Sequence, residues 1–355
     1  MIGQRIKQAR AAAGLSLRAL SAQAGVSHTA IAKYEQGDAT PSSEVLLTLS
    51  KALGVRVEYF FRAGGIELQG VEYRKQARVP QKALRRIEAA TLEQLERFLE
   101  LQELIPQRLV RPFSVPANLP TRIATLDAIE DLALALRSAW GLGRNPIPVL
   151  CDSLEERGIL VFQVETPAGG QFDGLAAKVQ DMPVVVVGRD WPGDRQRFTL
   201  AHELGHLVLD GRLAPELDEE KAAHRFAGAF LAPKPEVIKE LGATRTRLEP
   251  RELCVLKAAY GLSMAAWLFR ARDLGVLSEH AYIQHQKLFR SRAWHKREPC
   301  DPYPREAPQL FSQLLFHALA EDLVTESKAA ELMGMSTMDF HAMRHMERAD
   351  AAAHQ

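Results

Sequence analysis

The sequence predicts a mainly helical protein with a small β-sheet, which is an α+β fold class. Long stretches place apolar residues three and four positions apart, the spacing that buries one face of a helix. Two runs, 159–164 and 183–187, are rich in β-branched residues and bounded by Gly and Asp, which is typical of strands, and a turn is expected at 169–174. With 46% hydrophobic and 25% charged residues, the 355-residue chain has the composition of globular domains.

The first 62 residues predict four short helices. Their patterns run over 2–13, 16–24, 27–34 and 41–54, with Ser available to cap the later three and Gly at or after each end. The second and third flank a turn centred on Gly25, which makes a helix-turn-helix whose second helix can enter the major groove of DNA. Basic residues outnumber acidic ones by eight to four here, a charge of +4 against +1 for the whole chain. The alternative is a four-helix bundle that serves only to dimerise.

The candidate DNA contacts lie around that turn. They are Arg18, Ser27, His28, Thr29 and Lys33, of which Arg18 and Lys33 are placed to touch phosphates. The segment resembles the Xre, or Cro/repressor-like, family in Leu17 to Leu20, Ala24 to Ser27, Ile31, Tyr34 to Gly37 and Pro41. The resemblance implies a double-stranded DNA operator and a homodimer that reads two half-sites. Gln residues that many relatives carry at the starts of the second and third helices are replaced, so base preference does not transfer.

A single long amphipathic helix is predicted from Gln81 to Leu104, after a Gly-Gly break at 64–65 and a short basic run at 74–78. Prolines 106 and 112 close this segment. Its apolar stripe is expected to pack against the domain that follows, with a second copy of the chain as the alternative.

Residues 197–209 contain His-Glu-x-x-His inside an otherwise apolar helical stretch. Four residues make about one helical turn, so His202 and His206 project side by side, and two neutral imidazoles can hold one Zn²⁺ ion. Glu203 then lies beside the open position of the metal, where it is placed to deprotonate the water that the ion activates. The alternative is a chance spacing, which the apolar flanks disfavour because two buried histidines would need a partner.

A second helix, predicted in the segment 219–233, offers the third zinc ligand. Its apolar stripe places Glu220 one turn ahead on the same face, which makes Glu220 the preferred ligand. Glu219 points about 100° away and His224 follows Glu220 by four positions, so both stay open as alternatives.

These two helices resemble the ImmA/IrrE-type metallopeptidases, in Arg197 to His206, in Glu220 to Ala227 and in Leu231 to Pro233, within a likeness that covers residues 120–235. The resemblance implies a zincin-like fold, one zinc held by His202, His206 and Glu220, and Glu203 as the general base. It also implies proteolysis in bacterial gene control, in stress response or toxin-antitoxin modules. Asp210 and Gly211 depart from the pattern, because many relatives place another His there.

Four parts are therefore expected: a helix-turn-helix domain at 1–62, a linker with the long helix at 63–118, a metallopeptidase domain at 119–290, and a Pro-rich linker with a C-terminal helical unit at 291–355. That unit, with helices at 310–320, 328–336 and 338–346, is expected to pack or to bind a partner rather than DNA. No signal core and no membrane-length apolar run is present, and three scattered cysteines suggest cytoplasm and reduced thiols.

The function expected from the sequence is that of a DNA-binding transcriptional regulator whose zinc endopeptidase domain relieves repression by cutting a protein substrate or partner, encoded by a neighbouring gene, or itself. The alternative is a non-proteolytic, antitoxin-like repressor that binds a partner protein and autoregulates its operon.

Overall fold

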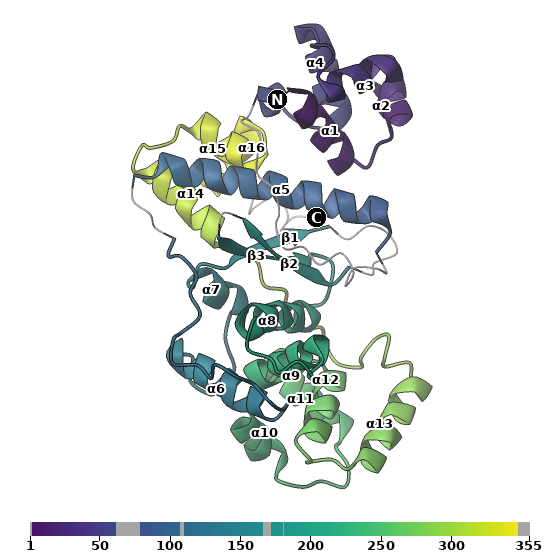
Figure 1. Cartoon of the computed structure of the whole chain (residues 1–355), viewed down its shortest axis with the longest axis vertical. Coiled ribbons are helices and arrows are strands. Elements are labelled where there is room, and N and C mark those ends of the chain that lie inside the picture. Colours follow the sequence, from purple (N-terminus) through teal and green to yellow (C-terminus); the bar gives the residue numbers. More distant parts are fainter. Residues whose placement is uncertain (1, 62–78, 107–109, 166–171, 180, 347–355) are drawn as a thin grey trace.

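A computed structural model of the chain describes residues 2–61, 79–106, 110–165, 172–179 and 181–346. The expected Gly-Gly break and basic run, and the first half of the turn at 169–174, lie outside the described residues. A helical domain lies at one end of the long axis of the molecule, followed by α5, a three-stranded sheet and a larger group of helices (Figure 1).

The N-terminal domain contains α1 (Ile2–Ala12), α2 (Leu17–Ala24), α3 (His28–Gln36), α4 (Ser43–Leu53) and the short 3₁₀ helix η1 (Val57–Phe61). Ser16, Ser27 and Ser42 cap α2, α3 and α4, and each side-chain oxygen accepts a hydrogen bond from a backbone N–H of the first turn. The capped starts agree with the expected ones, while α3 continues two residues further than expected. Ile6, Leu20, Ile31, Leu49 and Phe60 are fully buried in the core of this domain.

The sheet contains β1 (Leu160–Val164), β2 (Gly174–Val179) and β3 (Met182–Gly188), in the order β1-β3-β2. β1 is parallel to β3, and β2 is antiparallel to it. The two predicted strands are present, but β2 was not predicted as a strand. Its sequence, Gly-Leu-Ala-Ala-Lys-Val, has a single β-branched residue and so a low strand propensity. The segment forms a strand because it pairs with β3.

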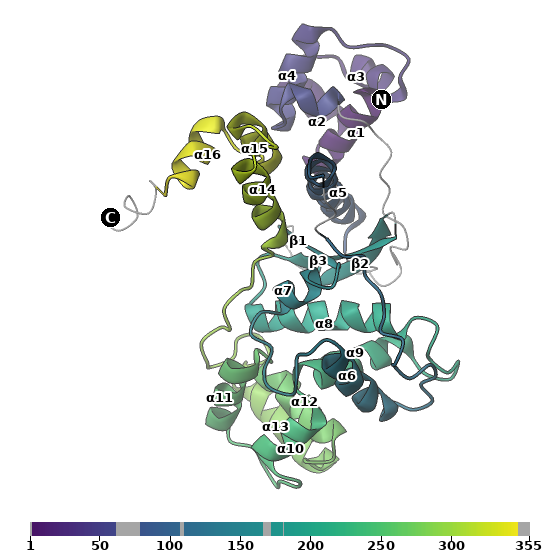
Figure 2. The same cartoon turned by 90° about the vertical axis from the view of Figure 1, so that its left-hand side faces the viewer.

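The two faces of the sheet belong to different cores, because side chains alternate along a strand. On β3, Val184 and Val186 lie in one core, and Val185 and Val187 lie in the other. The first core also contains α5 (Gln81–Leu104) and the C-terminal helices α14 (Leu310–Ala320), α15 (Glu326–Met333) and α16 (Thr337–Arg344). Figure 2 shows α5 and α14 on this side of the sheet and α8 (Gly193–Leu209) on the other. The apolar stripe of α5 is thus used within the chain, as expected.

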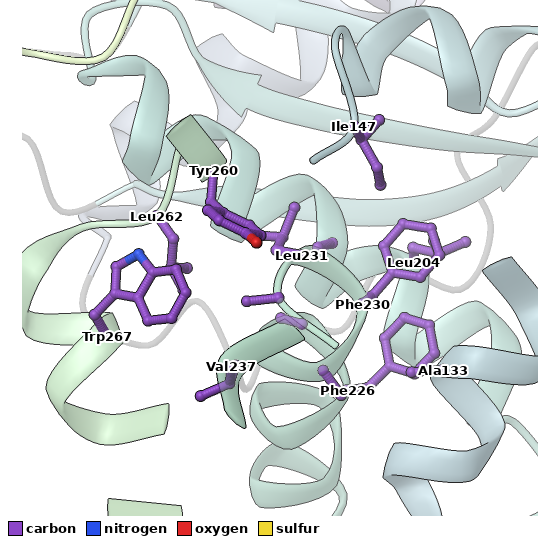
Figure 3. Close-up of a cluster of buried hydrophobic side chains, with 14 of the residues drawn as sticks. Ala133, Ile147, Leu204, Phe226, Phe230, Leu231, Val237, Tyr260, Leu262 and Trp267 are labelled. Atoms are coloured by element: carbon purple, nitrogen blue, oxygen red, sulfur yellow. The ribbon is translucent and has the colours of Figure 1, made fainter. Parts of the chain in front are cut away.

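The second core carries the remaining helices. They are α6 (Ala128–Ala139), α7 (Leu150–Glu155), α8 (Gly193–Leu209), α9 (Glu219–Leu231), α10 (Lys234–Leu241), α11 (Pro250–Tyr260), α12 (Met264–Asp273) and α13 (Glu279–Ser291). Aromatic side chains fill its centre: Phe226 and Phe230 stack on each other at 5.5 Å, and Tyr260 meets Trp267 edge-on at 5.1 Å (Figure 3). The stacked pair lies on α9, and the edge-on pair joins the end of α11 to α12.

A disulfide joins Cys254 on α11 to Cys300 in the Pro-rich linker, while Cys151 is a buried free thiol. The expectation of three reduced thiols is therefore wrong for this pair. The two cysteines are 46 residues apart in sequence, and α12 folds back between them, so their spacing gives no sign of the contact.

No single helix among the described residues is both long and apolar enough to cross a membrane. One pair, α11 and α12, meets at 98° and passes that test together on length and composition alone.

Candidate metal site and DNA-binding surface

The helix α8 carries the His-Glu-x-x-His motif against the sheet and against α9. Its apolar side, which includes Leu200, Leu204 and Val208, is buried. Gly205 lies where α8 and α9 approach most closely, because a Cβ atom there would lie 3.0 Å from the Phe226 ring and 3.3 Å from Ala223. A glycine inside the motif thus lets the second helix approach closely enough for its first turn to reach the histidines.

The first turn of α9 is fixed by Asp218. Its Oδ1 accepts a hydrogen bond of 2.8 Å from the backbone N–H of Lys221, which caps the helix and sets where Glu219 and Glu220 begin. Further along, Phe226 and Phe230 anchor the helix in the core.

Three side chains from these helices converge. His202 Nε2 lies 3.0 Å from His206 Nε2, Glu220 Oε2 lies 3.3 Å from His202 Nε2, and Glu220 Oε1 lies 3.6 Å from His206 Nε2. The rings of His202 and His206 stand nearly perpendicular, at 86°. The three side chains that the sequence predicts as ligands are therefore brought together.

These distances fit a tetrahedral zinc ion. Zn–N and Zn–O bonds of about 2.0–2.2 Å at tetrahedral angles require neighbouring ligand atoms to be about 3.3–3.5 Å apart. The observed 3.0–3.6 Å brackets that range. The donor set of two imidazoles and one carboxylate is one that catalytic zinc sites use.

The two alternative ligands occupy different places. Glu219 Oε1 lies 3.0 Å from Nδ1 of His206, on the side of the ring away from Nε2. His224 joins His202 and Glu220 in a group whose nitrogen and oxygen atoms all lie within 4.8 Å of one another. His224 is exposed to solvent, yet partial desolvation by its neighbours lowers its pKa against the opposing effect of Glu220, and the neutral ring can bind a metal. The geometry favours Glu220 as the third ligand, while the assignment itself stays a prediction.

Glu203, the predicted general base, is partly exposed on α8 between the two histidines. A partly exposed carboxylate can exchange protons with water, as a general base must. Its catalytic role also stays a prediction.

Two acidic residues that the sequence analysis did not single out hold the start of α8. Glu306, in the Pro-rich linker, forms a buried ion pair with Arg197 and accepts hydrogen bonds from the backbone N–H groups of Leu150 and Cys151. Glu298 lies 2.8 Å from the buried Lys257, which also faces Asp194 of α8 at 3.4 Å. A charged residue at 197 within an apolar helix was the one sequence signal for this anchoring.

The five candidate DNA-contact side chains, Arg18, Ser27, His28, Thr29 and Lys33, are all exposed on α2, α3 or the turn between them. Ser27 also caps α3 and lies 3.2 Å from the Thr29 hydroxyl. Arg10, by contrast, is held in a bidentate pair with Glu35 at 2.6 and 2.8 Å. Among the candidate contacts, Arg18 and Lys33 are thus the exposed basic residues, whereas the charge of Arg10 is paired within the domain.

Comparisons with known proteins agree with both halves of the chain. Residues 6–60 match the helix-turn-helix family model, and residues 154–272, which include the whole candidate metal site, match the IrrE N-terminal-like domain. The fold and the matches thus define a DNA-binding domain of the Xre type joined to an IrrE-like peptidase domain.

One curated relative, an uncharacterized transcriptional regulator in the ATPase CF(0) region of Rhodospirillum rubrum, is 42% identical over 60 residues. That match covers 17% of this chain and 56% of the relative.

Proposed function

We propose that this protein is a transcriptional regulator whose IrrE-like domain is a zinc-dependent endopeptidase that relieves repression, or controls a partner, by proteolysis. The convergence of His202, His206 and Glu220 at 3.0–3.6 Å carries the proposal. Zinc fits this donor set in number, type and spacing, and when bound it would supply Lewis-acid activation of water and of a peptide carbonyl.

The residues of the chain have separate tasks in this function. The two histidines and Glu220 hold the ion, and Glu203 accepts the proton of the attacking water and passes it to the leaving amine. The edge strand β2, which pairs on one side with β3, offers backbone groups to an extended substrate segment. The exposed face of α2 and α3 binds the operator, with Arg18 and Lys33 at phosphates. A homodimer would read two half-sites.

The position of His224 favours a second candidate function. Its ring centroid lies 4.6 Å from that of His202, which puts a fourth protein side chain beside the three proposed ligands. A fourth protein ligand would close the site, and closed zinc sites are structural. The protein would then be a non-proteolytic, antitoxin-like repressor that uses a metal-stabilised domain to bind a partner and autoregulates its operon.

Elemental analysis of the purified wild type, Glu203→Gln and His202→Ala, with operator release and partner cleavage measured in cells, tests the proposal. We expect about one zinc per chain in the wild type and in Glu203→Gln, and none in His202→Ala. Release and cleavage should be lost in both variants. His280→Ala, at an exposed histidine of α13, is the matched control and should behave as the wild type.

Full regulation by Glu203→Gln would favour the second candidate, because a scaffold needs the metal ligands but not a general base. A wild type without metal would contradict both candidates as stated.

A further inference from the structure

Glu219 and Glu220 are neighbours at the start of α9, yet their carboxylates meet different atoms of the same histidine. Glu219 Oε1 lies 3.0 Å from His206 Nδ1, whereas Glu220 Oε1 lies 3.6 Å from His206 Nε2. The contact between Nδ1 and Glu219 is within hydrogen-bond distance, whereas 3.6 Å is too long for a hydrogen bond between Nε2 and Glu220.

This arrangement selects one form of the ring. A neutral imidazole has one N–H donor and one acceptor nitrogen, and an ionised carboxylate can only accept a hydrogen bond. Glu219 therefore requires the proton of His206 to be on Nδ1. The lone pair is then on Nε2, which is the atom that lies 3.0 Å from His202 Nε2 and closest to Glu220.

We propose that Glu219 is a positioning residue that fixes His206 in the Nδ1–H tautomer and turns Nε2 toward the metal. The role in metal binding rests on the proposed function, while the tautomer does not. Histidine ligands of metals commonly donate their other N–H to a carboxylate, which orients the ring and raises its basicity. Here the cap formed by Asp218 fixes the turn that presents Glu219, so three consecutive residues cap the helix, orient one ligand and provide another.

The rival role for Glu219, as the third ligand itself, does not fit this geometry. A ligand must lie on the Nε2 side of His206, where Glu220 also reaches His202 at 3.3 Å. The contact of Glu219 is with the opposite ring nitrogen.

Metal affinity tests the positioning role. Zn²⁺ and Co²⁺ dissociation constants are measured by competition with a chromophoric chelator for the wild type, Glu219→Ala, Glu219→Gln and Glu220→Ala. We expect Glu219→Ala to weaken binding about 10–100-fold, and Glu219→Gln to weaken it less because the amide oxygen still accepts a hydrogen bond. Glu216→Gln, which removes an exposed carboxylate from the preceding turn, is the matched control and should change nothing. Wild-type affinity in Glu219→Ala, or metal lost there and kept in Glu220→Ala, would overturn the proposal.

The tautomer is measured separately, in metal-free protein, by long-range ¹H–¹⁵N NMR of histidine-labelled chain. The signals of His206, one of 11 histidines, are assigned with His206→Gln. We expect a protonated Nδ1 and a bare Nε2 in the wild type, and a shift toward the Nε2–H form in Glu219→Ala. An Nε2–H ring in the wild type would refute the proposal. Because this readout needs neither metal nor peptidase activity, it remains decisive even if the proposed function fails.

Discussion

Single residues that are not proposed metal ligands help to decide whether the candidate metal site can form. Gly205 has no side chain to offer a metal, yet it permits the contact between α8 and α9 that brings Glu220 to the histidines. Asp218 is equally remote from the proposed ion and sets the first turn of α9. The sequence showed the ligand types through their spacing and favoured Glu220, but it left Glu219 and His224 open as alternatives. The distinction between the two glutamates depends on which nitrogen of His206 each carboxylate meets, a contact across 13 positions.

Glu155 is a buried carboxylate for which we predict a pH-dependent contribution to stability. Burial raises its pKa to about 7, although the backbone N–H groups of Gln309 and Leu310 oppose this by hydrogen bonding to it. Since the folded-state pKa lies above the unfolded one, its contribution is full at low pH and is lost as pH rises through about 7. Between about pH 5 and pH 8, the free energy of unfolding should therefore fall more in the wild type than in Glu155→Gln, measured by urea denaturation.

The neighbouring Glu156→Gln is the control for this experiment, because its side chain is 67% exposed. It should keep the pH dependence of the wild type. Equal pH slopes in the wild type and Glu155→Gln would show that burial does not shift this carboxyl as described.

Among the elements, the Pro-rich linker contributes more to the folded structure than a linker composition suggests. It runs from the disulfide at Cys300 past the start of α8, where the backbone N–H of Gly193 donates to the carbonyl of Tyr303 and Arg305 donates to the carbonyls of Asp190 and Trp191. These hydrogen bonds anchor the linker along the start of α8. Four prolines lower the conformational freedom that this segment loses on folding, which favours an extended strap.

We predict that removing the disulfide destabilises this domain without abolishing its fold. A crosslink across 46 residues restricts the unfolded chain by about 4 kcal/mol in the chain-entropy model, and measured effects are commonly 2–4 kcal/mol. Cys254→Ser/Cys300→Ser should lower the urea midpoint, followed by tryptophan fluorescence, and dithiothreitol should lower that of the wild type similarly. The double variant should not respond to dithiothreitol. A wild-type midpoint that is unchanged by reduction would contradict the prediction.

At the scale of the whole molecule, the chain is ordered as a stack in which α5 lies between the DNA-binding domain and the sheet (Figures 1 and 2). Local signals predicted most of its parts: serine caps located α2 to α4, and periodicity gave α5 its bounds. The long-range pairings were not predictable. β2 forms a strand only through its pairing with β3. α5 shares a core with α14, although more than 200 residues separate the two helices in sequence. Neither contact produces a periodic or compositional signal in a short stretch of sequence, so neither could be predicted from it.

The contact between the DNA-binding domain and α5 supplies the last prediction. Arg5 of α1 forms a buried ion pair with Glu96 of α5, and its guanidinium lies 5.4 Å from the Tyr59 ring centroid. Removing one partner of a buried pair costs about 3–5 kcal/mol, because the other charge is left uncompensated, whereas apolar replacement of both is often neutral. Glu96→Ala should therefore release the domain, so that ¹⁵N relaxation shows it tumbling faster than the rest, while zinc content is unchanged. Arg5→Met/Glu96→Met should restore docking, and Glu103→Ala, at an exposed position of α5, should not disturb it. If Glu96→Ala tumbles as one body with the rest of the chain, the ion pair does not hold the two parts together, and the apolar contacts of α1 with α5 must suffice.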